Sequence, residues 1–229
     1  AVDPIFGDMA DFEEMVKVGQ QHGIDFMLDM VLNHCSIEHE WFQKALAGDS
    51  YYQDFFILRD EPTDWLSKFG GSAWAPFGDT GKYYLHLYDV TQADLNWRNP
   101  NVRQELFKVV NFWRDKGVKG FRFDVINVIG KDEVLTDCPE QEGKPAYTDK
   151  PIVHDYLHMM NEVTFGQDDS VMTVGEMSAT TIENCILYTA PDRQELSMAF
   201  NFHHLKVDYE AGQKWTLKAF DFEELKRLF

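Results

Sequence analysis

The sequence predicts an α/β fold in which parallel strands alternate with covering helices, as in part of a (β/α)8 barrel. Three observations support this prediction. Apolar runs of strand length recur along the chain, segments with helical spacing precede three of them, and a glycine separates helix from strand in the first two units. Such alternation is typical of a parallel sheet covered by helices.

The first helix–strand unit lies near the start of the sequence. Asp11 is expected to cap a helix, with Glu14 as its partner three residues later, and Gly23 is expected to end that helix. A strand is predicted over 24–31, because the run is mostly apolar, as buried parallel strands are.

The second unit is the clearest one. Asn99 and Pro100 are expected to be the N-cap and the first helical position, and Gly117 is expected to close the helix. Apolar residues between them recur at helical spacing. A strand is predicted to follow over 118–125.

Two further strands complete the predicted sheet. A helix over 152–163 precedes a strand over 171–176, and a fourth strand is predicted within 196–202. A closed barrel of this type has eight strands. About four are present, so we expect this sequence to hold strands 3 to 6 and the start of the sixth helix, with strands 1–2, strands 7–8 and any C-terminal domain outside it.

The stretch between the first and second units interrupts the rhythm. It is rich in aromatic residues, glycine and aspartate, and it is too long for an ordinary loop. We therefore predict barrel parts over 1–34 and 98–229, and a small inserted domain over 35–97.

Composition excludes several classes of partner. Lys plus Arg is 21 and Asp plus Glu is 39, so the formal net charge is 21 − 39 = −18. An acidic surface repels nucleic acid and anionic membranes, and no membrane-spanning run or signal peptide is present. Three cysteines without a CxxC pair (Cys35, Cys138 and Cys185) favour a reducing compartment, so we expect a cytoplasmic protein.

Arg122 and Asp124 form the first candidate site. Side chains alternate between faces along a strand, so these two point the same way. A guanidinium beside a carboxylate stabilises its ionised form, and an ionised carboxylate at the carboxyl end of a strand is a competent nucleophile. A purely structural ion pair remains an equal alternative for this pattern taken alone.

Glu176 is the second candidate, because it ends the apolar strand 171–176. A poorly solvated carboxyl keeps its proton more readily, as a general acid must, although an exposed helix cap is the commoner role. Asp124 and Glu176 are expected on adjacent strands, ~4.8 Å apart. Retaining glycosidases separate their two carboxyl groups by ~5–5.5 Å, so the pair favours a double displacement.

The first strand adds three polar residues at the same predicted edge. Asp29 interrupts an apolar strand and therefore needs partners, and Asn33 and His34 follow at the strand's end. His34 could donate a hydrogen bond to a sugar hydroxyl, although a satisfied turn residue is the commoner case. The histidine spacing does not fit a metal site, and no metal is predicted.

Four ordered motifs resemble the α-amylase superfamily of glycoside hydrolases. They are Asp29-Met-Val-Leu-Asn-His34, Gln92-Ala-Asp-Leu-Asn96, Gly120-Phe-Arg-Phe-Asp124 and Val174-Gly-Glu176. The resemblance implies that Asp124 is the nucleophile, that Glu176 is the acid/base, and that Arg122 and His34 contact the glucose unit at the cleaved bond. It implies no cofactor, and it places any calcium-binding loop near the first strand, outside this sequence.

Finer motifs resemble one branch of that family. Val125 follows the nucleophile, where the branch acting on α-1,6 bonds and related disaccharides has valine. The stretches 89–97, 175–181 and 200–209 look like the enzymes that hydrolyse trehalose 6-phosphate rather than the oligo-1,6-glucosidases. Lysines past a sixth barrel strand, Lys206 and Lys214, would then contact the phosphate, and otherwise they are ordinary surface lysines. The expected partner is thus a small sugar or sugar phosphate.

Other functions stay open at this stage. Oligo-1,6-glucosidase or dextran glucosidase activity is the nearest alternative. A non-catalytic protein with the amylase fold is a second, although such proteins typically lose the carboxylates that this sequence retains. The family also needs a third acid after the seventh strand, so an inactive fragment is a further possibility.

Overall fold

A four-stranded parallel sheet forms the centre of the computed structural model, which describes residues 2–210 and 216–228. Its strands lie in the order β1-β7-β8-β9. They are β1 (Met27–Val31), β7 (Gly120–Asp124), β8 (Met172–Glu176) and β9 (Met198–Phe200). The four predicted strands are confirmed, the first three shorter than expected by one or more residues and the fourth within its predicted range. Their spatial order equals their chain order, as in a (β/α) barrel.

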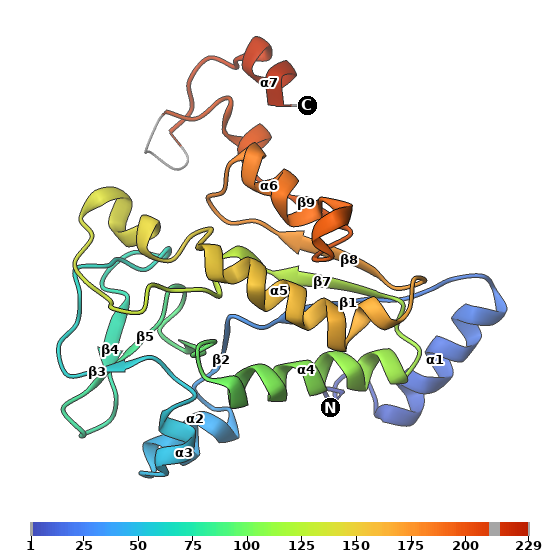
Figure 1. Cartoon of the computed structure of the whole chain (residues 1–229), viewed down its shortest axis with the longest axis horizontal. Coiled ribbons are helices and arrows are strands. Elements are labelled where there is room, and N and C mark those ends of the chain that lie inside the picture. The colour runs from blue at the N-terminus through green and yellow to red at the C-terminus, as the bar shows by residue number, and fades with distance from the viewer. Residues whose placement is uncertain (1, 211–215, 229) are drawn as a thin grey trace.

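Helices cover one face of this sheet (Figure 1). α4 (Pro100–Asp115) and α5 (Pro151–Val163) lie side by side there. α1 (Met9–Gln21) precedes β1, and α6 (Ile182–Thr189) contacts β9. The core between helices and sheet contains the following buried residues: Val102, Leu106, Val110, Phe121, Phe123, Val153, Leu157 and Met160.

The ends of these helices test the capping predictions. Asn99 caps α4 as predicted, since its side chain accepts a hydrogen bond from the Asn101 amide at 2.9 Å. The prediction for α1 is wrong. Asp8 is the N-cap, and Asp11 sits at the third helical position, where its carboxylate accepts from the Asp8 amide in a capping box. The helix begins at Met9, three residues earlier than a helix capped by Asp11 would begin. Aspartates stand at both positions, and the earlier one is the cap.

Residues between β1 and α4 leave the sheet and fold separately. β2 (His34–Ser36) pairs antiparallel with β6 (Gln92–Asp94). A second antiparallel sheet has the order β3-β5-β4. Its strands are β3 (Leu58–Arg59), β5 (Tyr83–Leu85) and β4 (Trp74–Pro76), and two short helices, α2 (Glu40–Leu46) and α3 (Ser50–Gln53), precede them.

This insertion lies beyond the carboxyl ends of the parallel strands (Figure 1). It has a small apolar cluster of its own, which contains Trp65, Trp74, Leu85 and Leu87. The cluster also includes Val125, the residue after β7. The insertion is therefore packed directly against the edge of the sheet where the candidate catalytic residues lie.

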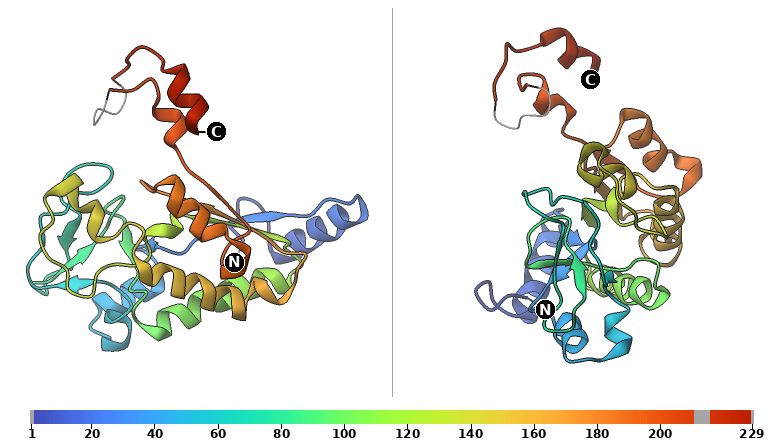
Figure 2. Two further views of the ribbon diagram at one scale, coloured as in Figure 1. Left: turned by 45° about the horizontal axis from the view of Figure 1, so that its top comes forward. Right: turned by 90° about the vertical axis from the view of Figure 1, so that its left-hand side faces the viewer.

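Short 3₁₀ helices fill the remaining connections. They are η1 (Ile126–Val128), η2 (Glu140–Ala146), η3 (Phe165–Gln167), η4 (Pro191–Arg193) and η5 (His203–Lys206). After β9 the chain turns away from the sheet and ends in α7 (Phe222–Leu228), which contacts η5 (Figure 2).

Candidate active site

Arg122 lies at the centre of the polar cluster on the sheet. Its Nη1 atom is 2.6 Å from Asp29 Oδ1 and 2.8 Å from Asp124 Oδ1, and its Nη2 atom contacts Glu176 Oε2. The strand register explains this. Asp29 pairs with Arg122 across β1 and β7, and Phe123 pairs with Gly175 across β7 and β8, so the next two residues are neighbours. One guanidinium thus joins carboxylates from three strands.

The cluster is partly shielded from solvent. The exposed fraction of the side chain is 13% for Glu176, 23% for Asp124 and 24% for Arg122, against 59% for Asp29. Burial lowers the pKa of the Arg122 guanidinium, but its hydrogen bonds and charge interactions with Asp29 and Asp124 outweigh burial and raise the pKa overall. Arg122 therefore stays a cation and holds the carboxylates together.

Glu176 differs in one respect from its sequence prediction. Its side chain is poorly solvated, as expected for a residue that ends an apolar strand. However, the Arg122 guanidinium contacts it directly, and this cation was not part of the prediction for Glu176. Alternation along β7 predicted the Arg122–Asp124 pair only, whereas the third partner depends on how β7 and β8 align.

A buried ion pair supports the end of β1. Lys131 Nζ lies 2.8 Å from Asp94 Oδ2 and donates to Asn33 Oδ1 at 2.8 Å. Asn33 in turn donates to Asp94 Oδ2 at 3.1 Å. Asn33 and Asp94 are fully buried, and Lys131 is 4% exposed. Burial lowers the pKa of Lys131, while the charge and hydrogen bond of Asp94 oppose that shift.

Sequence reasoning missed Lys131 although a signal was present. Lys131 follows the run 125–129, which is apolar except for Asn127, after one glycine, and every residue of that run is buried. A lysine that remains buried must find an anionic partner, since isolated buried charges are costly. That partner is Asp94 of the insertion. It lies 37 residues earlier in the chain, and no local sequence pattern indicates that the two residues meet.

His34 is buried beside this pair, at the start of β2. Asn33 Nδ2 lies 3.3 Å from its Nδ1 atom and Gln92 Nε2 lies 3.1 Å from its Nε2 atom. The Tyr88 ring lies 5.4 Å away, centroid to centroid. Burial lowers the pKa of His34, while the charges of Asp94 and Asp124 act in the opposite direction. The ring is therefore neutral at pH 7, and it interacts electrostatically with the Asp124 carboxylate.

The two candidate phosphate contacts fall outside this description. Lys214 lies outside the described residues, and so does the side chain of Lys206, whose backbone ends η5. Their role stays a prediction.

The described residues also bear on metals and membranes. Within 2–210 and 216–228, no group of three His, Cys, Asp or Glu side chains could hold a metal ion. In the same part of the chain, no helix has both the length and the apolar character needed to cross a bilayer.

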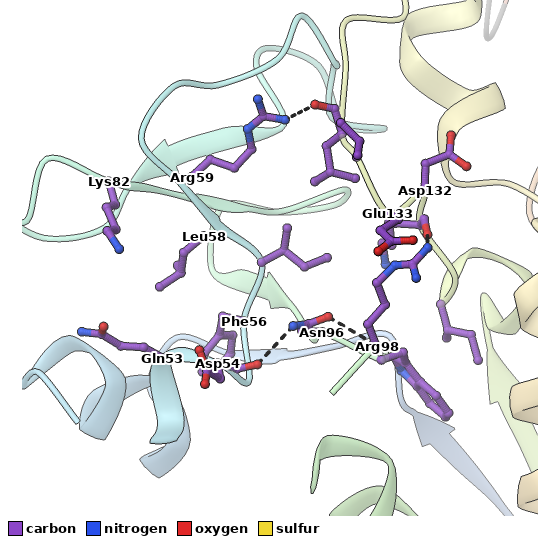
Figure 3. A pocket seen from close by; sticks show the side chains of 16 residues that line it. Gln53, Asp54, Phe56, Leu58, Arg59, Lys82, Asn96, Arg98, Asp132 and Glu133 are labelled. Carbon is purple, nitrogen blue, oxygen red and sulfur yellow. Dashed lines mark hydrogen bonds between the residues drawn. The ribbon is translucent and has the colours of Figure 1, made fainter. Parts of the chain in front are cut away.

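A cavity of about 580 Å³ lies between the insertion and the segment after η1 (Figure 3). Arg59 and Lys82 of the insertion line one side of it, and Arg98 and Glu133 line the other. Arg98 donates from Nη2 to the Lys131 carbonyl oxygen at 3.0 Å. Among the described residues that line it, neither Asp124 nor Glu176 occurs. The residues that the sequence indicates for catalysis therefore lie at the sheet edge and not in the lining of this cavity.

Comparison with known proteins identifies relatives of the whole chain. Residues 1–229 match the family model described as alpha amylase, catalytic domain. The trehalose-6-phosphate hydrolases of Bacillus subtilis (strain 168) and Escherichia coli (strain K12) are each 50% identical to this chain over its full length. The oligo-1,6-glucosidase of Parageobacillus thermoglucosidasius is 43% identical over 97% of the chain.

Solved structures agree with this grouping. The crystal structure of Bacillus licheniformis trehalose-6-phosphate hydrolase (TreA) superposes with a TM-score of 0.94 at 51% identity, and it covers all of this chain. The isomaltulose synthase of Klebsiella sp. LX3 gives a TM-score of 0.91 at 33% identity over 97% of the chain. The chain spans 42% of the length of the two trehalose-6-phosphate hydrolases that it matches. Its fold, its motifs and its match along all 229 residues show that this chain belongs to the α-amylase catalytic-domain family of glycoside hydrolases.

Proposed function

We propose that this chain supplies the nucleophile and the acid/base of a retaining α-glucoside hydrolase whose substrate is trehalose 6-phosphate. The observation that carries the proposal is the Arg122 guanidinium, which contacts both Asp124 and Glu176 from adjacent parallel strands. Two carboxyl groups bonded to one planar cation lie side by side. That arrangement suits the short separation of retaining enzymes better than the wider one of inverting enzymes.

In the first step, an oxygen of the Asp124 carboxylate attacks the anomeric carbon of the glucose unit. The bond from that carbon to the bridging oxygen breaks, and Glu176 gives its proton to that oxygen, so glucose 6-phosphate leaves. A glucosyl ester of Asp124 remains. Covalent catalysis of this kind divides one difficult displacement into two easier ones.

In the second step, water replaces the leaving group. The Glu176 carboxylate takes a proton from the water, whose oxygen attacks the anomeric carbon. The ester bond to Asp124 breaks, and glucose leaves with its original configuration. Arg122 carries a positive charge beside Asp124 throughout. The neutral ring of His34, whose two nitrogens lie beside the Asn33 and Gln92 amides, is the proposed contact for the glucose unit.

The substrate assignment rests on the relatives. The two trehalose-6-phosphate hydrolases are 50% identical to this chain over the aligned region, against 43% for the oligo-1,6-glucosidase of Parageobacillus thermoglucosidasius. Lys206 and Lys214 supply positive charge to a strongly acidic chain and are the proposed phosphate contacts. We also propose that the chain is divided into barrel parts over 1–34 and 98–229 and a small inserted domain over 35–97.

The proposed compartment is the cytoplasm. Cys35, Cys138 and Cys185 are free thiols. Burial raises the pKa of the Cys35 thiol to about 12, so this group stays protonated and unreactive at neutral pH. Unpaired thiols of this kind are compatible with a reducing environment.

The test uses the full gene product that contains this chain. Hydrolysis of trehalose 6-phosphate and of isomaltose is compared, and the anomer first released is identified by NMR. Glu176→Gln is expected to lower kcat on trehalose 6-phosphate by about 10²–10⁴-fold. The exposed Asp25 supplies the control variant Asp25→Asn. A 5-fluoroglucosyl inactivator is expected to label Asp124.

Each assignment fails separately in this design. Faster hydrolysis of isomaltose would replace the substrate assignment with oligo-1,6-glucosidase activity. An inverted product, or a label on a residue other than Asp124, would overturn the mechanism.

A further inference from the structure

Asn127 joins the segments that follow the two catalytic candidates. It lies three residues after Asp124, and Ser178 lies two residues after Glu176. The Ser178 amide donates to Asn127 Oδ1 at 2.7 Å, and Asn127 Nδ2 donates to the Ser178 carbonyl oxygen at 2.8 Å. One side-chain amide thus binds both polar groups of one peptide-chain residue, in a position that is fully buried.

This bridge begins where the sheet ladder ends. The last backbone pair of β7 with β8 is Phe123 with Gly175, one residue before each carboxylate. Beyond it, the chain after Asp124 turns through Val125, whose φ of 40° is left-handed and costly for a β-branched residue. Backbone pairing therefore stops just before the Asp124 and Glu176 carboxylates. Beyond that point, the hydrogen bonds of the Asn127 amide connect the two segments.

We propose that Asn127 is a positioning residue, which holds the acid/base Glu176 in place relative to the nucleophile Asp124. It does so by fixing the Ser178 backbone to the turn that follows Asp124. This inference rests on the proposed function, because it assigns Asn127 a role in the same reaction.

The orientation of the Asn127 amide is itself fixed. Its Nδ2 atom also donates to Asp149 Oδ1 at 2.8 Å. The Asp149 carboxylate receives further hydrogen bonds from Tyr188 at 3.0 Å and from Asn184 at 2.8 Å. A carboxylate accepts and cannot donate, so it selects the NH₂ end of the Asn127 amide. The Asp149 amide also donates to the Asn127 carbonyl oxygen at 3.0 Å, which holds the backbone of the turn.

The insertion reaches the same point. Lys68 Nζ donates to Ser178 Oγ at 2.8 Å, and it lies 5.4 Å from the centroid of the Tyr147 ring. Ser178 is thus held by its backbone from the Asp124 side and by its hydroxyl from the insertion. The peptide that follows the acid/base is constrained from two directions.

The decisive variant is Asn127→Asp in the full gene product. It keeps the shape of the side chain, but it replaces the NH₂ donor with an oxygen that faces the Ser178 carbonyl and the Asp149 carboxylate. Kinetics are compared for two substrates. Trehalose 6-phosphate needs a proton from Glu176 for its leaving group, whereas α-glucosyl fluoride releases fluoride without that proton.

A displaced acid/base predicts a specific pattern. We expect kcat/KM on trehalose 6-phosphate, which reports the first step, to fall by about 10²-fold, a typical effect of a misplacement of about 1 Å. The loss of kcat/KM on α-glucosyl fluoride should be much smaller, because its leaving group needs no proton. A general loss of structure would instead lower both activities together.

The matched control is Asn161→Asp. Asn161 Nδ2 also donates to a backbone carbonyl oxygen, that of Glu195, at 3.0 Å, but Asn161 lies on α5 rather than after a catalytic candidate. Its ratio of the two activities should equal that of the wild type. Asn127→Ala, which adds no charge, provides the measurement if the aspartate variant does not fold, as judged by circular dichroism and thermal unfolding.

The outcomes separate the two proposals. An unchanged activity ratio in both folded Asn127 variants, with an active wild type, would overturn the positioning role alone. A wild-type enzyme that hydrolyses neither substrate would overturn the proposed function itself.

Discussion

At the scale of single residues, the contacts that Arg122 makes with three carboxylates depend on the shape of its guanidinium as well as on its charge. Three carboxylates from three strands contact it, and a planar group with several N–H donors can serve them together. A lysine ammonium is a compact charge on a flexible stem. It would leave at least one carboxylate without its charged hydrogen bond.

We therefore expect Arg122→Lys in the full gene product to lower kcat/KM by about 10- to 100-fold, since a hydrogen bond to a charged group is worth about 1.5–3 kcal/mol. Steady-state kinetics on trehalose 6-phosphate measure the effect. Arg227→Lys on α7 is the control, because the Arg227 side chain is exposed. An unchanged kcat/KM for Arg122→Lys would show that charge alone is sufficient.

His34 gives the stability of the fold a pH dependence. Burial lowers its pKa below the ordinary value of 6.5, so the folded chain binds fewer protons than the unfolded chain between those two pKa values. The contribution of His34 to the free energy of unfolding therefore rises with pH across that window, and it is constant above 6.5. Below the window, the full cost of burying a charged imidazole is present.

We expect the wild type to lose stability as the pH falls below 6.5 and His34→Gln to lose less over the same range. Urea unfolding at about pH 7.5 and about pH 5 measures the difference between the two proteins. His22→Gln, at an exposed position after α1, should behave like the wild type. Parallel loss in all three proteins would mean that His34 is not the titrating group.

At the scale of elements, the connection between the insertion and the sheet depends on the buried pair of Lys131 and Asp94. Lys131 follows η1 on the sheet side, whereas Asp94 lies in β6 of the insertion. Removing only the cation would leave a buried carboxylate without its charge partner. That loss costs more than the pair itself contributes.

Lys131→Met should therefore lower the free energy of unfolding by about 3–5 kcal/mol, and the added change Asp94→Asn should recover part of that loss. Denaturant titration of the single and double variants measures both effects. Lys150→Met removes a half-exposed pair with Asp132 and should cost at most about 1 kcal/mol. If the double variant is less stable than Lys131→Met, the buried charge is not the cause.

The same elements show what sequence patterns can predict. The parallel strands were predictable because they are short, mostly apolar runs, three of which follow a predicted helix, and a glycine such as Gly117 marks the end of the helix in the first two units. The strands of the insertion are two or three residues long, too short for alternation to be recognised. Asp124 and Glu176 were found because they end such runs. Lys131 and Asn127 were missed because their importance comes from partners on other segments.

At the scale of the whole molecule, the segment after η1 is a place where added length should be tolerated. Glu133 and Val134 are both exposed, and they lie between β7 and β8 in the sequence. The free-energy cost of a longer flexible loop grows slowly, by about 0.6 kcal/mol for each doubling of its length.

We expect a four-residue Gly-Ser insertion between Glu133 and Val134 to leave kcat close to that of the wild type and to lower the free energy of unfolding by less than about 1 kcal/mol. The same insertion between Phe123 and Asp124, inside β7, should abolish activity. Both variants are measured in the full gene product by kinetics and urea unfolding. Loss of activity in the first variant would show that this segment also positions the site.

The order of the strands has an evolutionary consequence. Since β7 and β8 are neighbours in the sheet, the spacing of Asp124 and Glu176 depends on the backbone ladder and on the bridge made by Asn127 and its partner Asp149, and not on the length of the 47-residue segment between the strands. The other residues of that segment can be added to, removed or replaced over generations while the distance between the carboxylates stays the same. Descendants of one ancestor can in this way acquire different surroundings for the same pair of acids.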